Sequence, residues 1–307
     1  MAELRFDDRV AVITGAGRGL GRAYALLLAA RGARVVVSDT GGAISGENPD
    51  ASVGEAVVKE ITTAGGESVA CAESVATPQG GQAVIAAALD RYGRIDILIH
   101  NAGNNRYAPL TEMTYEDFDA VLDVHLRGAF HVVRPAFPVM CQAGYGRVVL
   151  TSSIGGLYGS RRVANYAAAK AGLIGLSNVV AIEGADHGVQ CNAIVPAALT
   201  RLAEGLDTSA YPPMGPDLAA PAAVWLAHES CPVSGEMLIT IAGRVARAFV
   251  AETPGVYQPS WTIEQVGEQI DAIRAPADPW ILPAVPSGQA DHITRSFAMA
   301  KEAQHAG

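Results

Sequence analysis

Tyr166 and Lys170 stand four positions apart, and Ser153 lies thirteen positions before the tyrosine. In a helix, residues i and i+4 share one face, so the phenol and the ammonium group would point the same way. A phenol has a pKa of about 10 in water, and a nearby cation moves that pKa toward the neutral range. A serine hydroxyl beside the phenol can hold a carbonyl or alcohol oxygen. These residue types suit proton transfer at an oxygen while a hydride leaves or reaches its carbon.

This spacing alone does not define a site, because tyrosine and lysine four residues apart also occur as solvated surface pairs. A glycine-rich segment, Thr14–Gly21, favours the chemical interpretation because it directly follows the apolar run Val10–Ile13. Its glycines allow a pyrophosphate to approach the backbone, and the next helix would point its amino end at the anion. An ordinary glycine-rich turn is the alternative, and the position between a strand and a helix argues against it. The predicted cofactor contacts here are Gly15, Gly17, Arg18, Gly19, Leu20 and Gly21.

Asp39 ends the second predicted strand, 18 residues beyond Gly21. A carboxylate at that point would accept hydrogen bonds from the ribose hydroxyls and repel a 2′-phosphate, which favours NAD over NADP. Arg18 is the opposing signal, because a guanidinium in the glycine-rich loop could bind that phosphate. We give Asp39 more weight since it lies where the ribose must sit, and we expect NAD as the cofactor.

Apolar strands alternate with helical stretches over residues 1–243. Strands are predicted at 10–13, 34–37, 68–71, 95–99, 147–150, 189–195 and 237–241, and helices at 24–30, 52–63, 81–92, from about 114 into 133, around Tyr166, and at 221–228. This order predicts an α/β fold, a Rossmann-type doubly wound parallel sheet of about seven strands with helices on both faces. Residues 1–243 would form the NAD-binding catalytic domain. Residues 244–307, where the periodicity weakens, would form an irregular C-terminal extension packed on it.

Composition excludes several classes of partner. Half of the 307 residues are hydrophobic and the net charge is −9, which argues against nucleic-acid binding. No apolar run reaches the roughly 18 residues of a membrane span, and the amino terminus has no signal-peptide core, so we expect a cytoplasmic protein without a membrane partner. The cysteines lack C-x-x-C spacing, so neither a metal site nor a disulfide is expected; they are Cys71, Cys141, Cys191 and Cys231.

Four motifs in this order make the chain resemble the short-chain dehydrogenase/reductase family over about residues 8–243. They are Thr14–Gly21, Asn101–Gly103 after the fourth predicted strand, Ser153, and the Tyr166/Lys170 pair. The resemblance implies that Tyr166 is the general acid/base, that Lys170 lowers its pKa and binds the nicotinamide ribose, and that Ser153 orients the substrate oxygen. Further cofactor contacts implied by it are Ser74, Val75, Asn101, Ala102, Gly103, Pro196 and Thr200.

The sequence departs from the family pattern at three positions. His125 stands where the family usually has an asparagine that holds a proton-relay water; an imidazole can also order water, and a merely packed helical histidine is the alternative. Ser74 replaces a common aspartate, which weakens the expected contact with the adenine. Ala197 replaces the glycine that often follows the proline at position 196.

Several stretches also resemble the (3R)-hydroxyacyl-CoA dehydrogenase portion of the peroxisomal multifunctional enzyme type 2 of β-oxidation. They are Gly21–Ala25, Ser38–Gly42, Val124–Phe130, Ala181–Gly184 and Trp225–Ser230. That branch uses NAD, in agreement with Asp39, and has a histidine at the position of His125. The resemblance implies NAD-dependent interconversion of a secondary alcohol and a ketone, with a (3R)-3-hydroxyacyl thioester as the favoured substrate. Alternatives are a 3-oxoacyl reductase, a steroid or cyclic-alcohol dehydrogenase, a non-catalytic nucleotide-binding protein, and a structural subunit of an active partner.

Two further features concern partners. Arg161 and Arg162 precede the catalytic tyrosine and could meet an acidic or phosphate-bearing substrate, or equally form a solvated loop pair. The family resemblance implies a homodimer or homotetramer paired through the long helix and the Tyr166 helix. The small and apolar residues of Ala167–Leu176 suit such pairing, and they equally suit packing on the sheet.

Overall fold

An eight-stranded sheet forms the centre of the computed structural model, which describes residues 3–200 and 210–306. The strand order is β3-β2-β1-β4-β5-β6-β7-β8, and the pairs from β3 through β7 are parallel. The bounds are β1 Val10–Thr14, β2 Arg34–Ser38, β3 Glu67–Cys71, β4 Ile97–His100, β5 Gly146–Thr151, β6 Val189–Ala197, β7 Met237–Ile241 and β8 Arg244–Ala248. The predicted α/β doubly wound fold is confirmed.

The sheet has one strand more than predicted. Strand β8 follows β7 after only two residues, Ala242 and Gly243, whose φ angles are 48° and 81°. Two positive φ angles in a two-residue connection are typical of a tight hairpin turn. Alanine rarely adopts such a backbone, so the sequence carried no turn signal here.

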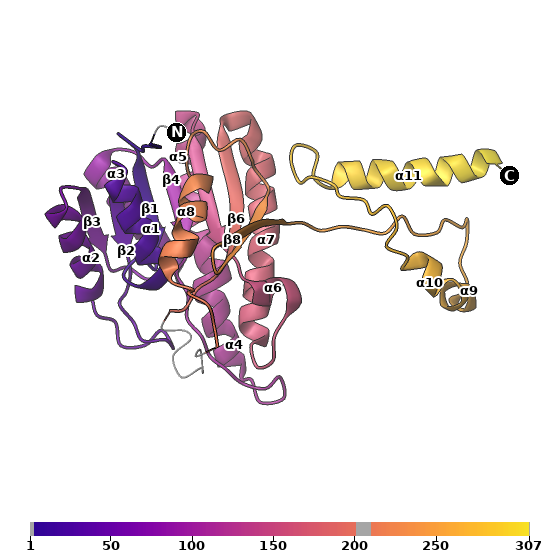
Figure 1. Ribbon diagram of the computed structural model, residues 1–307, viewed down its shortest axis with the longest axis horizontal. Helices are drawn as coiled ribbons and strands as arrows, with labels where there is room; N and C mark the ends of the chain where they lie inside the picture. Colours follow the sequence, from indigo (N-terminus) through magenta and orange to yellow (C-terminus); the bar gives the residue numbers. More distant parts are fainter. Residues whose placement is uncertain (1–2, 201–209, 307) are drawn as a thin grey trace. The chain divides into compact units, whose positions relative to one another are not determined.

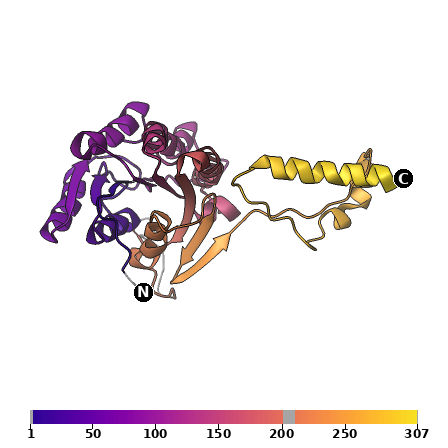
Figure 2. The same ribbon diagram turned by 90° about the horizontal axis from the view of Figure 1, so that it is seen from above.

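Helices cover both faces of the sheet (Figures 1 and 2). One face carries α1 Gly19–Ala30, α2 Ser52–Thr63 and α8 Pro216–Leu226, and the other carries α3 Pro78–Tyr92, α4 Tyr115–Leu122, α5 Gly128–Ala143 and α7 Ala164–Gly184. The core under α1 and α8 includes Ile13, Tyr24 and Leu28, all fully buried. Because the central strands are buried on both faces, their sequences read as continuous apolar runs.

Helix boundaries differ from the sequence prediction where proline is involved. Helices α3 and α8 begin at Pro78 and Pro216, earlier than predicted, because proline suits the first turn of a helix. The long helix runs through Pro135 to Ala143, ten residues further than predicted, with Ala136 and Met140 of that stretch fully buried. A π-helical turn, Asp123–Arg127, joins α4 to α5. Among the described residues no helix is long and apolar enough to cross a membrane.

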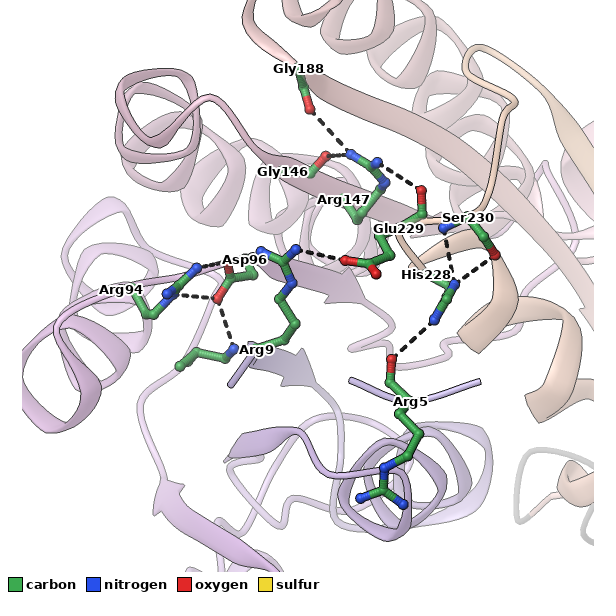
Figure 3. A network of polar contacts seen from close by, with 11 residues as sticks. Arg5, Arg9, Arg94, Asp96, Gly146, Arg147, Gly188, His228, Glu229 and Ser230 are labelled. Atoms are coloured by element: carbon green, nitrogen blue, oxygen red, sulfur yellow. Dashed lines mark hydrogen bonds and ion pairs between the residues drawn. The ribbon is translucent and has the colours of Figure 1, made fainter. Parts of the chain in front are cut away.

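The amino edge of the sheet is held together by a network of charged side chains (Figure 3). Asp96, 1% exposed, accepts hydrogen bonds from the backbone of Val10 at 2.9 Å, from Arg9 at 3.2 Å and from Arg94 at 2.6 Å. Arg147 is also buried and donates to the carbonyl oxygens of three residues, Gly146, Gly188 and Glu229. These contacts join β1, β4 and β5 at the edge where the strands begin.

The carboxyl edge presents polar side chains side by side. Thr14 at the end of β1 is in register with Ser38 of β2 and His100 of β4. The strand order reverses between β1 and β4, and in doubly wound sheets ligands bind in the crevice at such a point.

The chain divides into two compact units, Met1–Arg247 and Ala248–Gly307. The second unit contains α9 Ile263–Glu268, α10 Ile270–Ile273 and α11 Gln289–Ala306, so the predicted irregular extension is partly helical. In α11 the apolar side chains of Ile293 and Phe297 are 41% and 63% exposed. Because this helix buries no continuous apolar face, its sequence shows little of the periodicity that predicts a helix. That this extension packs on the catalytic domain stays a prediction.

Candidate active site

A cavity of about 700 Å³ opens at the carboxyl edge of the sheet. Of the residues predicted for catalysis or cofactor binding, the following line it: Gly15, Arg18, Gly19, Leu20, Asp39, Ser74, Val75, Asn101, Ala102, Gly103, His125, Ser153, Tyr166, Lys170, Pro196 and Thr200. Gly17 and Gly21 do not line it. The structure thus brings together residues from six strand ends, from the π-helical turn Asp123–Arg127 and from the start of α7.

The glycine-rich loop approaches its neighbours too closely for side chains. Gly15 has a φ of +65°, and a Cβ there would lie 2.7 Å from the Cα of Ala102. A Cβ at Gly21 would lie 2.1 Å from the carbonyl oxygen of Gly15. Helix α1 begins at Gly19, and no side chain caps its first turn in the described structure. Its first amides border the cavity and suit a phosphate.

Asp39 joins the glycine-rich loop to residues 40–50. Its carboxylate accepts a hydrogen bond from the backbone N–H of Gly17 and another from that of Gly41, both at 2.7 Å. The guanidinium of Arg18 donates to the carbonyl oxygens of Gly41 and Gly42, at 3.2 and 3.3 Å. Arg18 is therefore bound to the backbone of this loop.

Lys170 is held by the end of β5. The side chain is buried, 3% exposed, and its Nζ donates a hydrogen bond to the carbonyl oxygen of Thr151. The Oγ of Ser152 donates to the carbonyl oxygen of Lys170 at 2.7 Å. The Nζ lies 5.6 Å from the ring centroid of Tyr166, so the four-residue spacing does place both groups on one face of α7.

Burial dominates the electrostatics of this pair. It lowers the pKa of Lys170 from 10.5 to about 7. It raises the pKa of Tyr166, and hydrogen bonding to the Ser153 side chain acts in the opposite direction. The lowering of the Tyr166 pKa by Lys170, expected from the sequence, stays a prediction.

Ser153 lies beside the tyrosine ring. It is the N-cap of the short helix α6, Ile154–Tyr158, and its Oγ accepts the backbone N–H of Gly155 at 3.1 Å. A Cβ at Gly155 would lie 3.5 Å from Cε1 of Tyr166 and 3.6 Å from Oγ of Ser153. The hydroxyl and the ring thus lie near the same glycine, and both residues line the cavity.

His125 stands in the π-helical turn, a distortion that is frequent at functional sites. Its ring meets that of Tyr166 edge-on, with centroids 5.3 Å apart. Nε2 lies 2.8 Å from the carbonyl oxygen and 3.1 Å from the backbone nitrogen of Asn104. Nδ1 is buried with no hydrogen-bond partner among the described residues. Burial, and then the charge of Lys170, lower the pKa of His125, so the imidazole is neutral.

Two buried polar residues to which the sequence analysis assigned no role of their own, Thr14 and His100, fix the strand ends. Oγ1 of Thr14 accepts the backbone N–H groups of Asn101 and Ala102, both at 3.1 Å, and lies 3.0 Å from Nδ1 of His100. Nε2 of His100 lies 3.0 Å from the carbonyl oxygen of His125. The sequence signal that could have identified Thr14 and His100 is that each is a polar residue at the end of an otherwise apolar strand.

Asn165 is a third buried polar residue that the sequence analysis did not single out. It is fully buried, and its Nδ2 donates to the carbonyl oxygens of Arg106 and Asp117, both at 3.0 Å. Its Oδ1 accepts the backbone N–H of Tyr166 at 2.8 Å. The backbone of the tyrosine is thereby tied to α4 and to the segment that follows β4.

Residues 9–207 match the family model described as short chain dehydrogenase. The chain belongs to this family. This dehydrogenase is 47% identical over 260 residues to the peroxisomal multifunctional enzyme type 2 of Drosophila melanogaster, an alignment that covers 84% of this chain and 43% of that protein. It therefore spans less than half the length of that relative.

Two solved structures resemble the dehydrogenase over nearly its full length. The full-length peroxisomal multifunctional enzyme type 2 from Drosophila melanogaster matches with a TM-score of 0.80 and 38% identity, over 97% of this chain and 50% of that one. A short chain dehydrogenase from Mycobacterium avium matches with a TM-score of 0.77 and 36% identity, over 91% and 98% of the two chains. The predicted family is confirmed, which makes this protein an oxidoreductase of CH–OH groups in a family that uses NAD(P).

Proposed function

We propose that this dehydrogenase interconverts (3R)-3-hydroxyacyl and 3-oxoacyl thioesters with NAD. The observation that carries the proposal is the convergence of Ser153, Tyr166 and Lys170 on one cavity, which the glycine-rich loop and Asp39 also line. The thioester is favoured because of the similarity to peroxisomal multifunctional enzyme type 2.

The cavity residues fit a dinucleotide. The uncapped first turn of α1 would hold the pyrophosphate, Asp39 the adenosine ribose hydroxyls, and Lys170 the nicotinamide ribose. Arg18 supports NAD over NADP, because its guanidinium is already bound to two loop carbonyls and a 2′-phosphate would have to displace them. When bound, the nicotinamide ring supplies the acceptor for the hydride.

The protein's own side chains would move the proton. Tyr166, as phenolate, takes the proton of the substrate hydroxyl during oxidation, while Ser153 holds the oxygen. Burial raises the pKa of Tyr166, so oxidation should accelerate as pH rises and the phenolate becomes populated. His125 lines the cavity beside the phenol, and its buried Nδ1 has no hydrogen-bond partner among the described residues. A water that reached this atom would find a free hydrogen-bonding position there and could carry the proton away.

The remaining proposals follow the family resemblance. They are a homodimer or homotetramer and a small-molecule substrate that includes acyl-CoA. Sedimentation of the purified chain tests the first of these. A cytoplasmic location is proposed from the sequence composition and not from this resemblance, because the relatives are named as peroxisomal enzymes.

Turnover with a substrate panel tests the activity. The full chain is supplied with NAD and with (3R)- and (3S)-3-hydroxyacyl-CoA of several lengths, a steroid alcohol and a cyclic alcohol, and NADH absorbance is followed. The (3R) thioesters should give the highest kcat/KM. Tyr166→Phe should lower kcat by about 10²- to 10⁴-fold because the acid/base group is lost, while NAD binding survives. Near wild-type turnover in that variant would show that another group transfers the proton.

A further inference from the structure

The loop between α6 and α7 carries two adjacent arginines, Arg161 and Arg162, that the proposed chemistry does not use. Both are exposed, and neither guanidinium has an ion-pair or hydrogen-bond partner among the described residues. Some exposed arginines of the same unit are paired: Arg22 lies 2.6 Å from Glu60, and Arg127 pairs with Asp123. Arg134 and Arg244 are exposed without such a partner among the described residues, but neither is next to a cavity-lining residue. The loop therefore presents two uncompensated positive charges.

This loop forms part of the rim of the active-site cavity. The residues on either side of the arginines, Ser160 and Val163, both line the cavity. The carbonyl oxygen of Arg162 accepts the backbone N–H of Ala108 at 3.1 Å, and Tyr107, the preceding residue, is another lining residue. Arg162 has a φ of 66°, a left-handed conformation that is costly for a residue other than glycine. The backbone of Arg161 and Arg162 therefore lies at the rim, between two lining residues, although neither arginine lines the cavity itself.

The charge around them favours an anionic ligand. Among the described lining residues the only carboxylates are Asp39 and Glu73, which follow β2 and β3 at the adenosine end of the cavity. The chain as a whole carries a net charge of −9. Two adjacent guanidinium groups without a partner among the described residues therefore make this part of the rim locally positive. Guanidinium groups bind phosphate with paired hydrogen bonds, and a local positive potential steers an anion to a site.

We propose that Arg161 and Arg162 form a subsite for the phosphate groups of a coenzyme A-type thioester whose acyl end reacts at Tyr166. This inference rests on the proposed function, because it assigns the non-reacting half of the proposed substrate. A thioester without phosphate should react at the same centre and ignore the subsite.

A comparison of two substrates with the same acyl group tests the subsite. One is the (3R)-3-hydroxyacyl-CoA, and the other is its N-acetylcysteamine thioester, which has no phosphate. In the variant Arg161→Gln/Arg162→Asn, asparagine keeps the left-handed backbone accessible. The KM of the CoA thioester should rise about tenfold or more with kcat nearly unchanged, because two charge-assisted contacts are lost. The kinetics of the short thioester should not change.

The matched control removes the same charge elsewhere. Arg31→Gln/Arg91→Gln acts at the carboxyl ends of α1 and α3, by the opposite edge of the sheet, and should leave both substrates unaffected. Three outcomes would each overturn the proposal: an equal rise in KM for both thioesters, no rise for either, or an equal rise in the control variant. A 4′-phosphopantetheine thioester shows which phosphate of CoA the arginines bind. If the double variant raises the KM of this thioester as much as that of the CoA thioester, the arginines bind the phosphate that the two molecules share. If only the KM of the CoA thioester rises, they bind the phosphates of its nucleotide part.

Direct binding keeps the subsite testable if the activity itself is absent. Titration calorimetry of desulfo-CoA into the NAD-loaded wild-type protein should show binding that weakens about tenfold or more in the double variant. No binding, or equal binding by both proteins, would overturn the subsite. Failure of every thioester to be oxidised, with this binding difference intact, would refute only the proposed function.

Discussion

Replacement of Lys170 by methionine should abolish turnover and make the stability of the protein less dependent on pH. The ammonium group is buried and donates a hydrogen bond to the carbonyl oxygen of Thr151, and burial lowers its pKa from 10.5 to about 7. Between those two pKa values the folded protein holds the lysine neutral while the unfolded chain keeps it protonated. The unfolded state then binds more protons, so this residue makes stability rise with pH across that window.

The size of the effect follows from the same difference in pKa. Each pKa unit corresponds to about 1.4 kcal/mol, so the lysine costs the folded state about 5 kcal/mol well below pH 7 relative to its neutral form. Between about pH 6 and pH 9 some 2–3 kcal/mol of that cost should disappear. Lys170→Met does not titrate, so its advantage in unfolding free energy over the wild type should shrink by that amount over the same range.

Urea unfolding at the two pH values, followed by circular dichroism, measures this change. The difference in unfolding free energy between variant and wild type cancels the contributions of the other titrating groups. Lys59→Met removes an exposed lysine and is the control, because its gap, meaning this difference from the wild type, should not vary with pH. A pH-independent gap for Lys170→Met would mean that Lys170 stays protonated throughout, and the pKa argument would be wrong.

Four further substitutions test the site. Asp39→Ala should weaken NAD binding about tenfold and reduce the ratio of kcat/KM with NAD to kcat/KM with NADP. An unchanged ratio would show that another residue determines the cofactor preference. His125→Phe keeps a ring beside Tyr166 and should lower kcat about tenfold or more with KM unchanged, whereas unaffected kcat would exclude the water-holding role. Gly103→Ala places a Cβ 2.4 Å from Cε1 of His125 and should lower the free energy of unfolding by about 1–3 kcal/mol, a loss that adding His125→Ala should partly reverse. Asn165→Ala removes three buried hydrogen bonds, two to carbonyl oxygens and one from the backbone N–H of Tyr166, and should lower both kcat and the thermal midpoint. An unchanged kcat would show that this residue has no part in positioning Tyr166.

Local physics explains what could be predicted from the sequence. The strands are short apolar runs, the phosphate loop lies between a strand and a helix, and the spacing of Tyr166 and Lys170 follows from helical periodicity alone. These features depend on neighbouring residues, so they are visible in a linear sequence.

The features that could not be predicted depend on contacts between distant residues or on unusual backbone. Asn165 contacts the carbonyl oxygen of Arg106, 59 positions away, and Thr14 contacts backbone groups 87 and 88 positions away. The π-helical turn at His125 and the positive φ of Ala242 have no residue signature of their own. The raised pKa of Tyr166 likewise required knowledge of its burial.

Strand β8 has a consequence for self-association. It stands at the end of the strand order, where unpaired backbone groups could recruit a strand from another copy and lead to aggregation. β8 has only five residues, and two of them are the charged residues Arg244 and Arg247, features by which natural proteins discourage edge-to-edge pairing. Copies of this dehydrogenase should therefore assemble through helical surfaces rather than by extending one sheet into the next.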